Sequence, residues 1–392
     1  MLPLDGLLVV SLEHAIAAPL ATRHLADLGA RVVKVERPQG GDFARAYDAR
    51  ARGIASHFAW CNRSKESLTL DLKQPQAHAA LMKLVGRADV LVQNLAPGAA
   101  ARMGLSFEAL SPAHPRLIVC DISGYGDSGP YVEKKAYDLL VQAESGFVSI
   151  TGTPETPAKA GNSIADIAAG MYAYSGILAA LLERGQTGRG RRVDIALLES
   201  MTEWMGYPLY FGMDGAPPPP RTGAAHATIY PYGPFRAGDG RSVLLGVQND
   251  REWKVFAREV LKRPELADDP RFAGNAQRVA HRDEIDAVAE EAFAGIGLEE
   301  LVRRLDEAGI ANGRINDVDA VWKHPQLAAR HRWTEVGSPA GPLPALIPPG
   351  RRDAADARLG PIPALGEHSR AILAELDYAP TDIERLAAAG AI

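Results

Sequence analysis

The first third of the chain alternates short apolar runs with stretches of helical periodicity, and this alternation restricts the fold more than any other feature of the sequence. Strand, helix and strand in succession form right-handed βαβ units, whose strands lie parallel in one sheet. The runs expected as strands are residues 7–12, 30–36, 67–72, 89–95 and 116–123, and the expected helices are residues 18–29 and 76–88. The sequence therefore predicts an α/β domain built on a parallel sheet.

In a sheet of this type the ligand lies beyond the carboxyl ends of the strands. Those ends, with the residues just after them, are here the segments SLEHA, ERPQGGD, QNLAPG and ISGYGDSG. None of them contains GxGxxG, or GxxxxGK followed by Ser or Thr, so the dinucleotide and P-loop interpretations lose their main support. Lys34, Arg37 and Arg45 lie around the end of the second strand. They are either solvated surface charges or part of an anion site, and their spacing leaves both interpretations open.

The second half of the chain has a different organisation. Residues 214–227 are rich in Pro and Gly and break the preceding pattern, which is typical of a linker. An expected strand at 242–247 is followed by helical stretches around 251–262, 283–294 and 298–308, which together predict a small α+β domain. Residues 337–350 form a second irregular crossing, and the chain ends in two short expected helices.

Composition excludes several classes of protein. The chain has 392 residues, of which 46% are hydrophobic, and a formal net charge of −5, which argues against a nucleic-acid-binding protein. Cys61 and Cys120 are the only cysteines, so we expect neither a disulfide framework nor a cysteine-based zinc site, and a reducing cytoplasm fits. His14, His24 and His57 have no HExxH spacing, so no metal is expected. We also expect no signal peptide and no membrane-spanning segment.

One carboxylate, Asp166, lies within the small and apolar segment NSIADIAAG, residues 162–170. The apolar spacing that follows predicts a helix from about Ile167 to Arg184, with Asp166 at or just before its start. Asp166 is then either an N-cap, which accepts a hydrogen bond from a free backbone N–H group, or a reactive carboxylate in a pocket of small residues. The local pattern does not separate these two interpretations.

Several segments together resemble the class III CoA-transferases, the family of formyl-CoA transferase and carnitine CoA-transferase. They occur in the family's order along almost the whole chain. They are LEHAIAAPLATRHLADLGARVVKVERPQGGDFAR, NRSKESLTLDLK, VLVQNLAPGAAARMGL, SGYGDSGPY, YDLLVQAESG, TGRGRRVDIALLESM and PALGEH. The resemblance implies that Asp166, which matches the family's catalytic Asp just before a helix, is a nucleophile. It attacks an acyl-CoA thioester and forms a mixed anhydride and then an aspartyl-CoA thioester, from which an acceptor acid takes the CoA. A free Asp, with a pKa of about 3.9, is ionised at pH 7 and needs no activating base.

The resemblance also implies the residues that contact CoA, which is a substrate and not a tightly bound cofactor. His14 and Ala15 follow the first strand, Arg37 and Arg102 match basic residues near the nucleotide phosphates, and Lys135 matches a CoA-contacting lysine. Arg and Lys suit the negative phosphates of CoA. The remaining implied contacts are Leu72, Lys73, Asn94, Leu95 and Tyr137, of which Leu95 replaces a more usual aromatic residue.

The family forms a homodimer of two interlocked rings, and each chain builds a Rossmann-like large domain from both ends of its sequence. We therefore expect the N-terminal part of a large CoA-binding domain over 1–200 and a linker over 201–227. The small domain is expected over 228–325, and the return linker with the C-terminal part of the large domain over 326–392. The expected partners are an acyl-CoA, a small carboxylic acid and a second copy of the chain, with no nucleic acid and no membrane.

Two other activities stay open on the sequence. A 2-methylacyl-CoA racemase has the same fold but needs two acid/base groups flanking one carbon. Related racemases have a His immediately before an Asp, where this chain has Tyr137 before Asp138, and this favours transfer. A catalytically idle CoA-binding protein is the other alternative, and the intact Asp166 speaks against it. The N-terminal segment is similar to the branch that uses succinyl-CoA with malate, citramalate, itaconate or mesaconate. Arg45 and His24 are each either a group that holds the distal carboxylate of such an acid or a purely structural residue.

Overall fold

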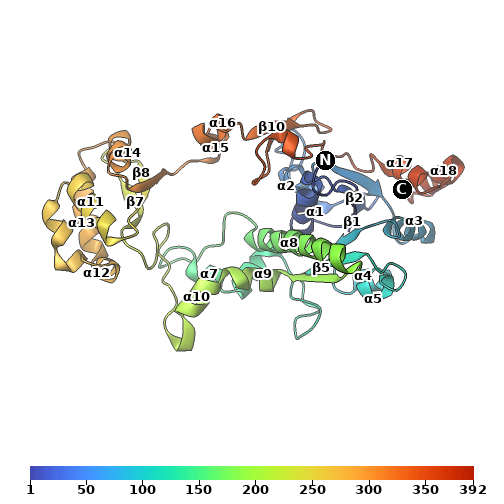
Figure 1. Ribbon diagram of the computed structural model, residues 1–392, viewed down its shortest axis with the longest axis horizontal. Helices are drawn as coiled ribbons and strands as arrows, with labels where there is room; N and C mark the ends of the chain where they lie inside the picture. Colours follow the sequence, from blue (N-terminus) through green and yellow to red (C-terminus); the bar gives the residue numbers. More distant parts are fainter. The chain divides into compact units, whose positions relative to one another are not determined.

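The computed structural model describes all residues from 1 to 392 and divides the chain into two compact units. Unit 1 consists of Met1–Gly146, Ala160–Gly206 and Pro325–Ile392, and unit 2 consists of Phe147–Lys159 and Tyr207–His324. Each unit has its own sheet and its own apolar core, as Figure 1 shows for the sheet strands. The expected division into a CoA-binding domain, linkers and a small domain stays a prediction, since the unit boundaries carry no information about function.

Unit 1 is built on a six-stranded parallel sheet with the order β3-β2-β1-β4-β5-β6. The strands are β1 (Leu8–Leu12), β2 (Arg31–Glu36), β3 (Lys65–Thr69), β4 (Val90–Gln93), β5 (Ile118–Ser123) and β6 (Arg192–Ala196). The predicted α/β fold with a parallel sheet is confirmed. The strand expected at 67–72 instead runs from Lys65 to Thr69, where it pairs with β2. The ammonium of Lys65 is buried at the start of this strand and is bonded to Glu13 at 2.6 Å.

Helices cover the sheet of unit 1 and bring distant parts of the chain together. α3 (Pro75–Val85), α17 (Ser369–Glu375) and α18 (Pro380–Ala388) share one apolar cluster with buried strand residues such as Val10, Val33 and Leu91. Figure 1 shows α17 and α18, in red, on the same side of unit 1 as α3, in blue. The backbone N–H of Asp71 donates to the carbonyl of Ala391 at 2.8 Å. The last residues therefore complete the domain that the first residues begin.

The shorter elements of unit 1 lie between the strands and in the return segment. They are η1 (Phe43–Ala46), α2 (Ser56–Cys61), α4 (Ala99–Arg102), α5 (Phe107–Leu110), α6 (Asp138–Glu144), α9 (Leu197–Trp204), α16 (Pro325–Ala329), η6 (Ala354–Asp356) and the antiparallel pair β10 (Trp333–Val336) and β11 (Leu343–Leu346).

The long helix α8 (Ile164–Thr187) packs along α1 (Ala17–Asp27) and on β5 and β6. Its buried face carries small residues, and a Cβ added at Gly170 would come within 2.7 Å of the carbonyl oxygen of Ala17. The small residues of the segment around Asp166 therefore allow close packing of two helices. By length and composition alone α8 is also apolar enough to cross a membrane; in this structure it packs on β5, β6 and α1.

Unit 2 is a small α+β unit with an antiparallel sheet of β7 (Tyr232–Arg236), β8 (Ser242–Gly246) and β9 (Ala311–Arg314). Its core contains Trp253, Phe256, Phe272 and Phe293. The helix expected around 251–262 is α11 (Asp250–Val255), which continues as the π-turn η3 (Phe256–Val260). The other elements are α7 (Phe147–Ile150), α10 (Gly206–Phe211), which crosses the unit boundary, η2 (Met213–Gly215), η4 (Pro264–Asp268), η5 (Pro270–Phe272), α12 (Asn275–Ala280), α13 (Arg282–Phe293), α14 (Leu298–Glu307) and α15 (Val318–Trp322).

Candidate active site

Asp166 is the third residue of α8 and not its N-cap. The helix begins at Ile164, three residues earlier than the spacing predicted, and its N-cap residue is Ser163, whose side chain makes no capping hydrogen bond. The N-cap interpretation of Asp166 is therefore wrong. Its carboxylate is half-buried and accepts no hydrogen bond and forms no ion pair with any other residue of the chain. The carboxylate of Asp166 is consequently free to react with a bound substrate.

The carboxylate that caps α8 belongs to Asp138, the first residue of α6. Its Oδ1 accepts hydrogen bonds from the backbone N–H groups of Ala165 at 2.8 Å and Asp166 at 3.3 Å. Its Oδ2 accepts one from Nε2 of Gln142 at 2.7 Å, and Oε1 of the fully buried Gln142 accepts the N–H of Ala160 at 2.9 Å. The beginning of α8 is thus fixed by a chain of three hydrogen-bonded groups, and Asp166 does not take part through its side chain.

The surroundings of Asp166 make it a weak acid. Burial, and then the negative charge of Asp138, raise the pKa of Asp166 from 3.8 to about 7. This corrects the expectation of an ordinary pKa, which considered the residue without its neighbours. A carboxylate with such a pKa holds a proton on about half of the molecules at neutral pH, and its ionised form is more basic, and so more nucleophilic, than an ordinary Asp.

A row of aromatic rings leads from the end of β1 to α2. The rings of His14 and Phe43 stack at 4.9 Å, Phe43 lies 5.8 Å from Tyr47, and Tyr47 meets His57 edge-on at 5.6 Å. Burial and the negative charges of Asp42 and Asp166 raise the pKa of Tyr47 to about 12. Tyr47 therefore lies close enough to Asp166 to interact with it, and its hydroxyl keeps its proton at neutral pH.

The loops that follow β1 and β4 are joined by two hydrogen bonds. The backbone N–H of His14 donates to Oδ1 of Asn94 at 2.9 Å, and Nδ2 of Asn94 donates to the carbonyl of His14 at 2.9 Å. In the observed strand order, the chain direction across the sheet reverses between β1 and β4, and ligands of open α/β sheets bind at such a point. The amide of Asn94, expected to contact CoA, is used in this structure to hold His14.

The other expected CoA contacts lie on segments that follow the parallel strands of the sheet. Arg37 is exposed and donates to the carbonyl of Gly41 at 3.0 Å, and the exposed Arg102 reaches no acceptor nearer than the carbonyl of Pro97 at 3.5 Å. These two guanidinium groups therefore have no carboxylate partner. The remaining residues comprise the exposed Lys73, Lys135 and Tyr137 and the half-buried Leu72 and Leu95, which pack against the core of the sheet.

The two residues considered for a distal carboxylate are engaged elsewhere. Arg45 donates to both carboxylate oxygens of Glu36, at 2.8 and 2.7 Å. His24 lies on α1, where burial and then the charge of Arg23 lower its pKa to about 3, so it is neutral. Neither side chain offers an unpaired positive charge. Sequence reasoning missed Tyr47, Asp42, and the role of Asp138 as a capping group. Asp42 and Tyr47 both lie in the segment GGDFARAY, but the local sequence does not indicate which groups they contact.

Comparisons with known proteins agree with one another. The family model described as CoA-transferase family III matches residues 4–369. Succinate–glutarate CoA-transferase of Agrobacterium fabrum is 35% identical over 385 residues, 96% of each chain. Acetyl-CoA:oxalate CoA-transferase of Acetobacter aceti is 35% identical over 86% of each chain. The alpha subunit of succinyl-CoA–L-malate CoA-transferase of Chloroflexus aurantiacus is 32% identical over 98% of this chain and 91% of that one.

Solved structures resemble the chain over nearly its whole length. A CAIB/BAIF family protein from Brucella suis has a TM-score of 0.83 and 37% identity, and the match covers 96% of this chain and 100% of that one. A hypothetical protein from Mycobacterium tuberculosis has a TM-score of 0.84 and 29% identity, with 95% and 99% covered.

Proposed function

The chain belongs to CoA-transferase family III, and from this premise we propose that it moves CoA from an acyl-CoA to a small dicarboxylic acid through a thioester on Asp166. The observation that carries the proposal is the state of Asp166 itself. It is a half-buried carboxylate without a hydrogen-bond partner, its pKa is raised to about 7, and it lies in the first turn of a helix that another acid caps. A carboxylate that makes no stabilising hydrogen bond in the fold, and whose pKa its surroundings raise, has the properties of a nucleophile.

The proposed reaction begins when the ionised Asp166 attacks the carbonyl carbon of the acyl-CoA. The C–S bond breaks, the CoA thiolate leaves with the electron pair, and a mixed anhydride remains on Asp166. The thiolate then attacks the aspartyl carbonyl, which releases the donor acid and leaves an aspartyl-CoA thioester. The acceptor carboxylate attacks this thioester, and the same steps run backwards to release the new acyl-CoA. One thioester is exchanged for another, so the reaction needs no ATP.

Acyl-CoA is proposed to bind at the carboxyl edge of the sheet in unit 1. Support comes from the two exposed arginines without carboxylate partners, Arg37 and Arg102. A guanidinium group forms bidentate hydrogen bonds with a phosphate. The turn at His14 and Ala15 follows β1 and is hydrogen-bonded to Asn94 in the loop after β4. We propose that this turn faces the pantetheine and the thioester of CoA. Leu72, Lys73, Asn94, Leu95, Lys135 and Tyr137 are the remaining proposed contacts.

The proposed donor is succinyl-CoA and the proposed acceptor is a short dicarboxylate such as itaconate, mesaconate, citramalate, malate or glutarate. Relatives at 32–35% identity are named for glutarate, oxalate, L-malate and D-citramalate, which supports a dicarboxylate without selecting one. Arg45, which is paired with Glu36, and His24, which is neutral, are not proposed to hold the distal carboxylate of the acid.

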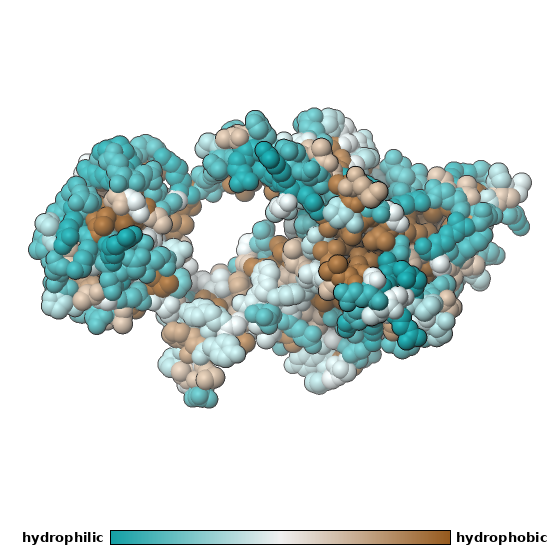
Figure 2. All heavy atoms as spheres, in the orientation of Figure 1, coloured by the Kyte–Doolittle hydropathy of each residue, from teal (hydrophilic) through white to brown (hydrophobic).

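We also propose that the protein is a homodimer. The outward face of α8 carries Met171, Ser175, Ala179 and Leu182, and Leu182 is 74% exposed. Figure 2 shows apolar residues, in brown, at the surface on this face of unit 1. A face of this composition is normally covered by another chain. Light scattering coupled to size-exclusion chromatography measures the mass directly, and a mass of one chain, 41.9 kDa, would overturn this proposal.

The decisive experiment traps the intermediate. Succinyl-CoA without an acceptor should leave a CoA-sized adduct on the protein, and hydroxylamine should convert Asp166 to a hydroxamate, because it reacts with thioesters and anhydrides but not with free carboxylates. A peptide map locates the change in NSIADIAAG. The same treatment of an Asp166→Asn variant should give neither adduct nor hydroxamate. Modification of Asp138 or Glu144 would mean that the nucleophile is wrongly assigned.

Two further readouts separate the alternatives. A panel of labelled dicarboxylates with succinyl-CoA measures transfer and ranks the acceptors. A 2-methylacyl-CoA in deuterated water tests the racemase, which must exchange the proton at the carbon next to the thioester. Exchange without transfer would favour the racemase, and CoA binding with neither reaction would favour an idle CoA-binding protein.

A further inference from the structure

The turn that follows β1 holds a residue in an unfavourable backbone conformation. Ala15 has a φ of +62°, in the left-handed region that residues with a Cβ rarely adopt. Such a conformation persists only where the surroundings impose it, and residues of this kind gather at ligand-binding sites. The groups that impose it here are therefore of interest.

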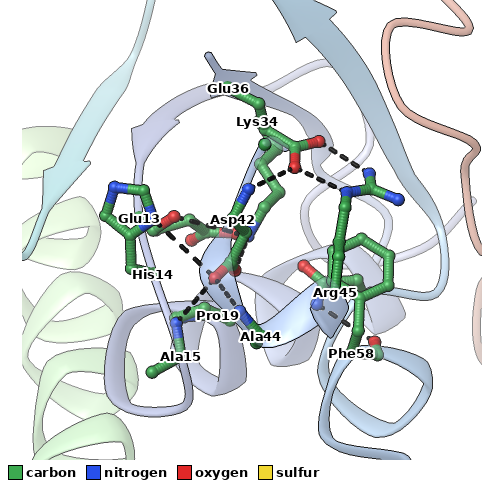
Figure 3. Close-up of polar contacts among 12 residues, drawn as sticks. Glu13, His14, Ala15, Pro19, Lys34, Glu36, Asp42, Ala44, Arg45 and Phe58 are labelled. Carbon is green, nitrogen blue, oxygen red and sulfur yellow. Dashed lines mark hydrogen bonds and ion pairs between the residues drawn. The ribbon is translucent and has the colours of Figure 1, made fainter. Parts of the chain in front are cut away.

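Two side chains hold this turn by hydrogen bonds to its backbone. Asn94 bonds both the N–H and the carbonyl of His14, each at 2.9 Å. Asp42 holds the next residue, since its Oδ1 accepts the N–H of Ala15 at 3.1 Å and that of Ala44 at 2.9 Å (Figure 3). The same oxygen lies 3.7 Å from Nδ1 of His14. Asp42 thus joins the loop after β1 to the loop after β2.

Asp42 is itself held rigidly within a buried ionic network. Its Oδ2 accepts a hydrogen bond from Nζ of Lys34 at 2.7 Å, and its backbone N–H donates to Glu36 at 3.0 Å. Both Asp42 and Lys34 are 0% exposed. Burial opposes the charge of Asp42, but Lys34 and the hydrogen bonds around it hold the pKa of this carboxyl well below its usual range. The network continues through Glu13, which bonds Lys65 at 2.6 Å.

We propose that Asp42 is a positioning residue for acyl-CoA binding: its Oδ1 holds Ala15 in the left-handed conformation and so presets the turn that receives the thioester end of CoA. The proposal rests on the proposed function, which places CoA against His14 and Ala15. Its physical basis is preorganisation, because a turn that is already held in its binding conformation loses less entropy when the ligand binds.

A purely structural network predicts something different. In that case the loss of Asp42 lowers the stability of unit 1, but molecules that are folded bind CoA as well as the wild type does. If Asp42 positions the turn, folded molecules lacking it bind CoA more weakly, and a glycine at position 15, which adopts a positive φ without strain, restores part of the affinity. The rescue by glycine is specific to the proposed role.

The experiment measures the dissociation constant of free CoA by isothermal titration calorimetry, with folding checked by circular dichroism. Asp42→Ala alone leaves Lys34 buried without its nearest partner and risks unfolding, so it is combined with Lys34→Met, which removes the unpaired charge. A third variant adds Ala15→Gly to this pair. Asp42→Asn keeps an oxygen for Ala15 and Ala44 but loses the charge. Ser67→Ala is the control, because Ser67 bonds Glu36 in the same network, at 2.6 Å, and does not touch the turn.

We expect the double variant to bind CoA about tenfold more weakly, as for the loss of one buried hydrogen bond, and Asp42→Asn and Ser67→Ala to stay within about threefold of the wild type. Ala15→Gly should recover at least about threefold of the loss. Wild-type affinity in the folded double variant, or no recovery with Ala15→Gly, would overturn the proposal. CoA binding is measured without turnover, so a wild type that binds CoA but transfers none refutes the proposed function alone. A wild type that does not bind CoA refutes both.

Discussion

Replacing Asp166 with asparagine should stabilise the protein above neutral pH while it abolishes CoA transfer. The two side chains have nearly the same shape, and the carboxylate of Asp166 has no hydrogen bond or ion pair to lose. The substitution therefore removes a charge and little else. The effect follows from the pKa of Asp166, which burial and the charge of Asp138 raise from 3.8 to about 7.

The sign follows from comparing the folded and unfolded chains. Below about pH 4 the carboxyl is protonated in both, so it costs nothing. Between about pH 4 and 7 the unfolded chain ionises and the folded chain does not, and folding becomes progressively less favourable. Above about pH 7 both are ionised and the whole cost is present. The asparagine side chain does not ionise and avoids this cost. The stability of the variant relative to the wild type must therefore increase as the pH rises.

The magnitude follows from the same values. Each pKa unit corresponds to about 1.4 kcal/mol, so the rise to about 7 corresponds to about 4 kcal/mol. Solvent reaches the half-buried side chain and reduces this to about 2 kcal/mol. The dipole of α8 favours a negative charge in its first turn by about 0.5 kcal/mol, which the variant loses. The expected net gain near pH 8 is therefore about 1 to 2 kcal/mol, and near pH 4 it is about zero.

Urea denaturation followed by circular dichroism, at about pH 4 and about pH 8, measures this difference. Glu133→Gln is the matched control, because Glu133 is an exposed carboxylate of unit 1 without a hydrogen bond or ion pair, and its replacement should leave both values unchanged. Equal stability of the wild type and Asp166→Asn near pH 8, or an equal gain at both pH values, would refute the reasoning. Either result would mean that the fold does not hold the nucleophile at a raised pKa.

Three further predictions concern turnover, binding and packing. The rate of CoA transfer should rise through about pH 7 as Asp166 ionises, and Asp138→Asn should move this rise to lower pH because it removes the neighbouring negative charge; an unchanged profile in the variant would contradict the assignment. Arg37→Ala or Arg102→Ala should raise the KM for acyl-CoA more than it lowers kcat, since contacts to the nucleotide are remote from the thioester, and a fall in kcat alone would place the nucleotide elsewhere. Gly170→Val should destabilise the protein by at least about 1 kcal/mol, because its Cβ would come within 2.7 Å of a backbone oxygen of α1; thermal unfolding unchanged from the wild type would show that α1 and α8 separate easily.

The sequence by itself determined the architecture of unit 1 and the family. Strand runs such as 7–12 and 30–36 are buried on both faces, and the parallel sheet follows because a strand, helix and strand in succession have one favourable handedness. These features depend on residues close together in the chain, and the pattern records them directly. The ordered segments that resemble the family likewise span almost the whole chain, which the family model confirms.

Only the tertiary structure decided the state of the candidate nucleophile. The carboxylate that caps its helix is Asp138, 28 residues before Asp166, and burial together with the charge of this carboxylate raises the pKa of Asp166. In the same way Asn94 holds His14 across 80 residues, and Lys65 is buried as the first residue of β3 because its ammonium donates a hydrogen bond to the carboxylate of Glu13, 52 residues away. Electrostatic and hydrogen-bond partners are set by distance in space, and a chain that folds back through a parallel sheet brings together groups whose separation along the sequence carries no trace of their contact.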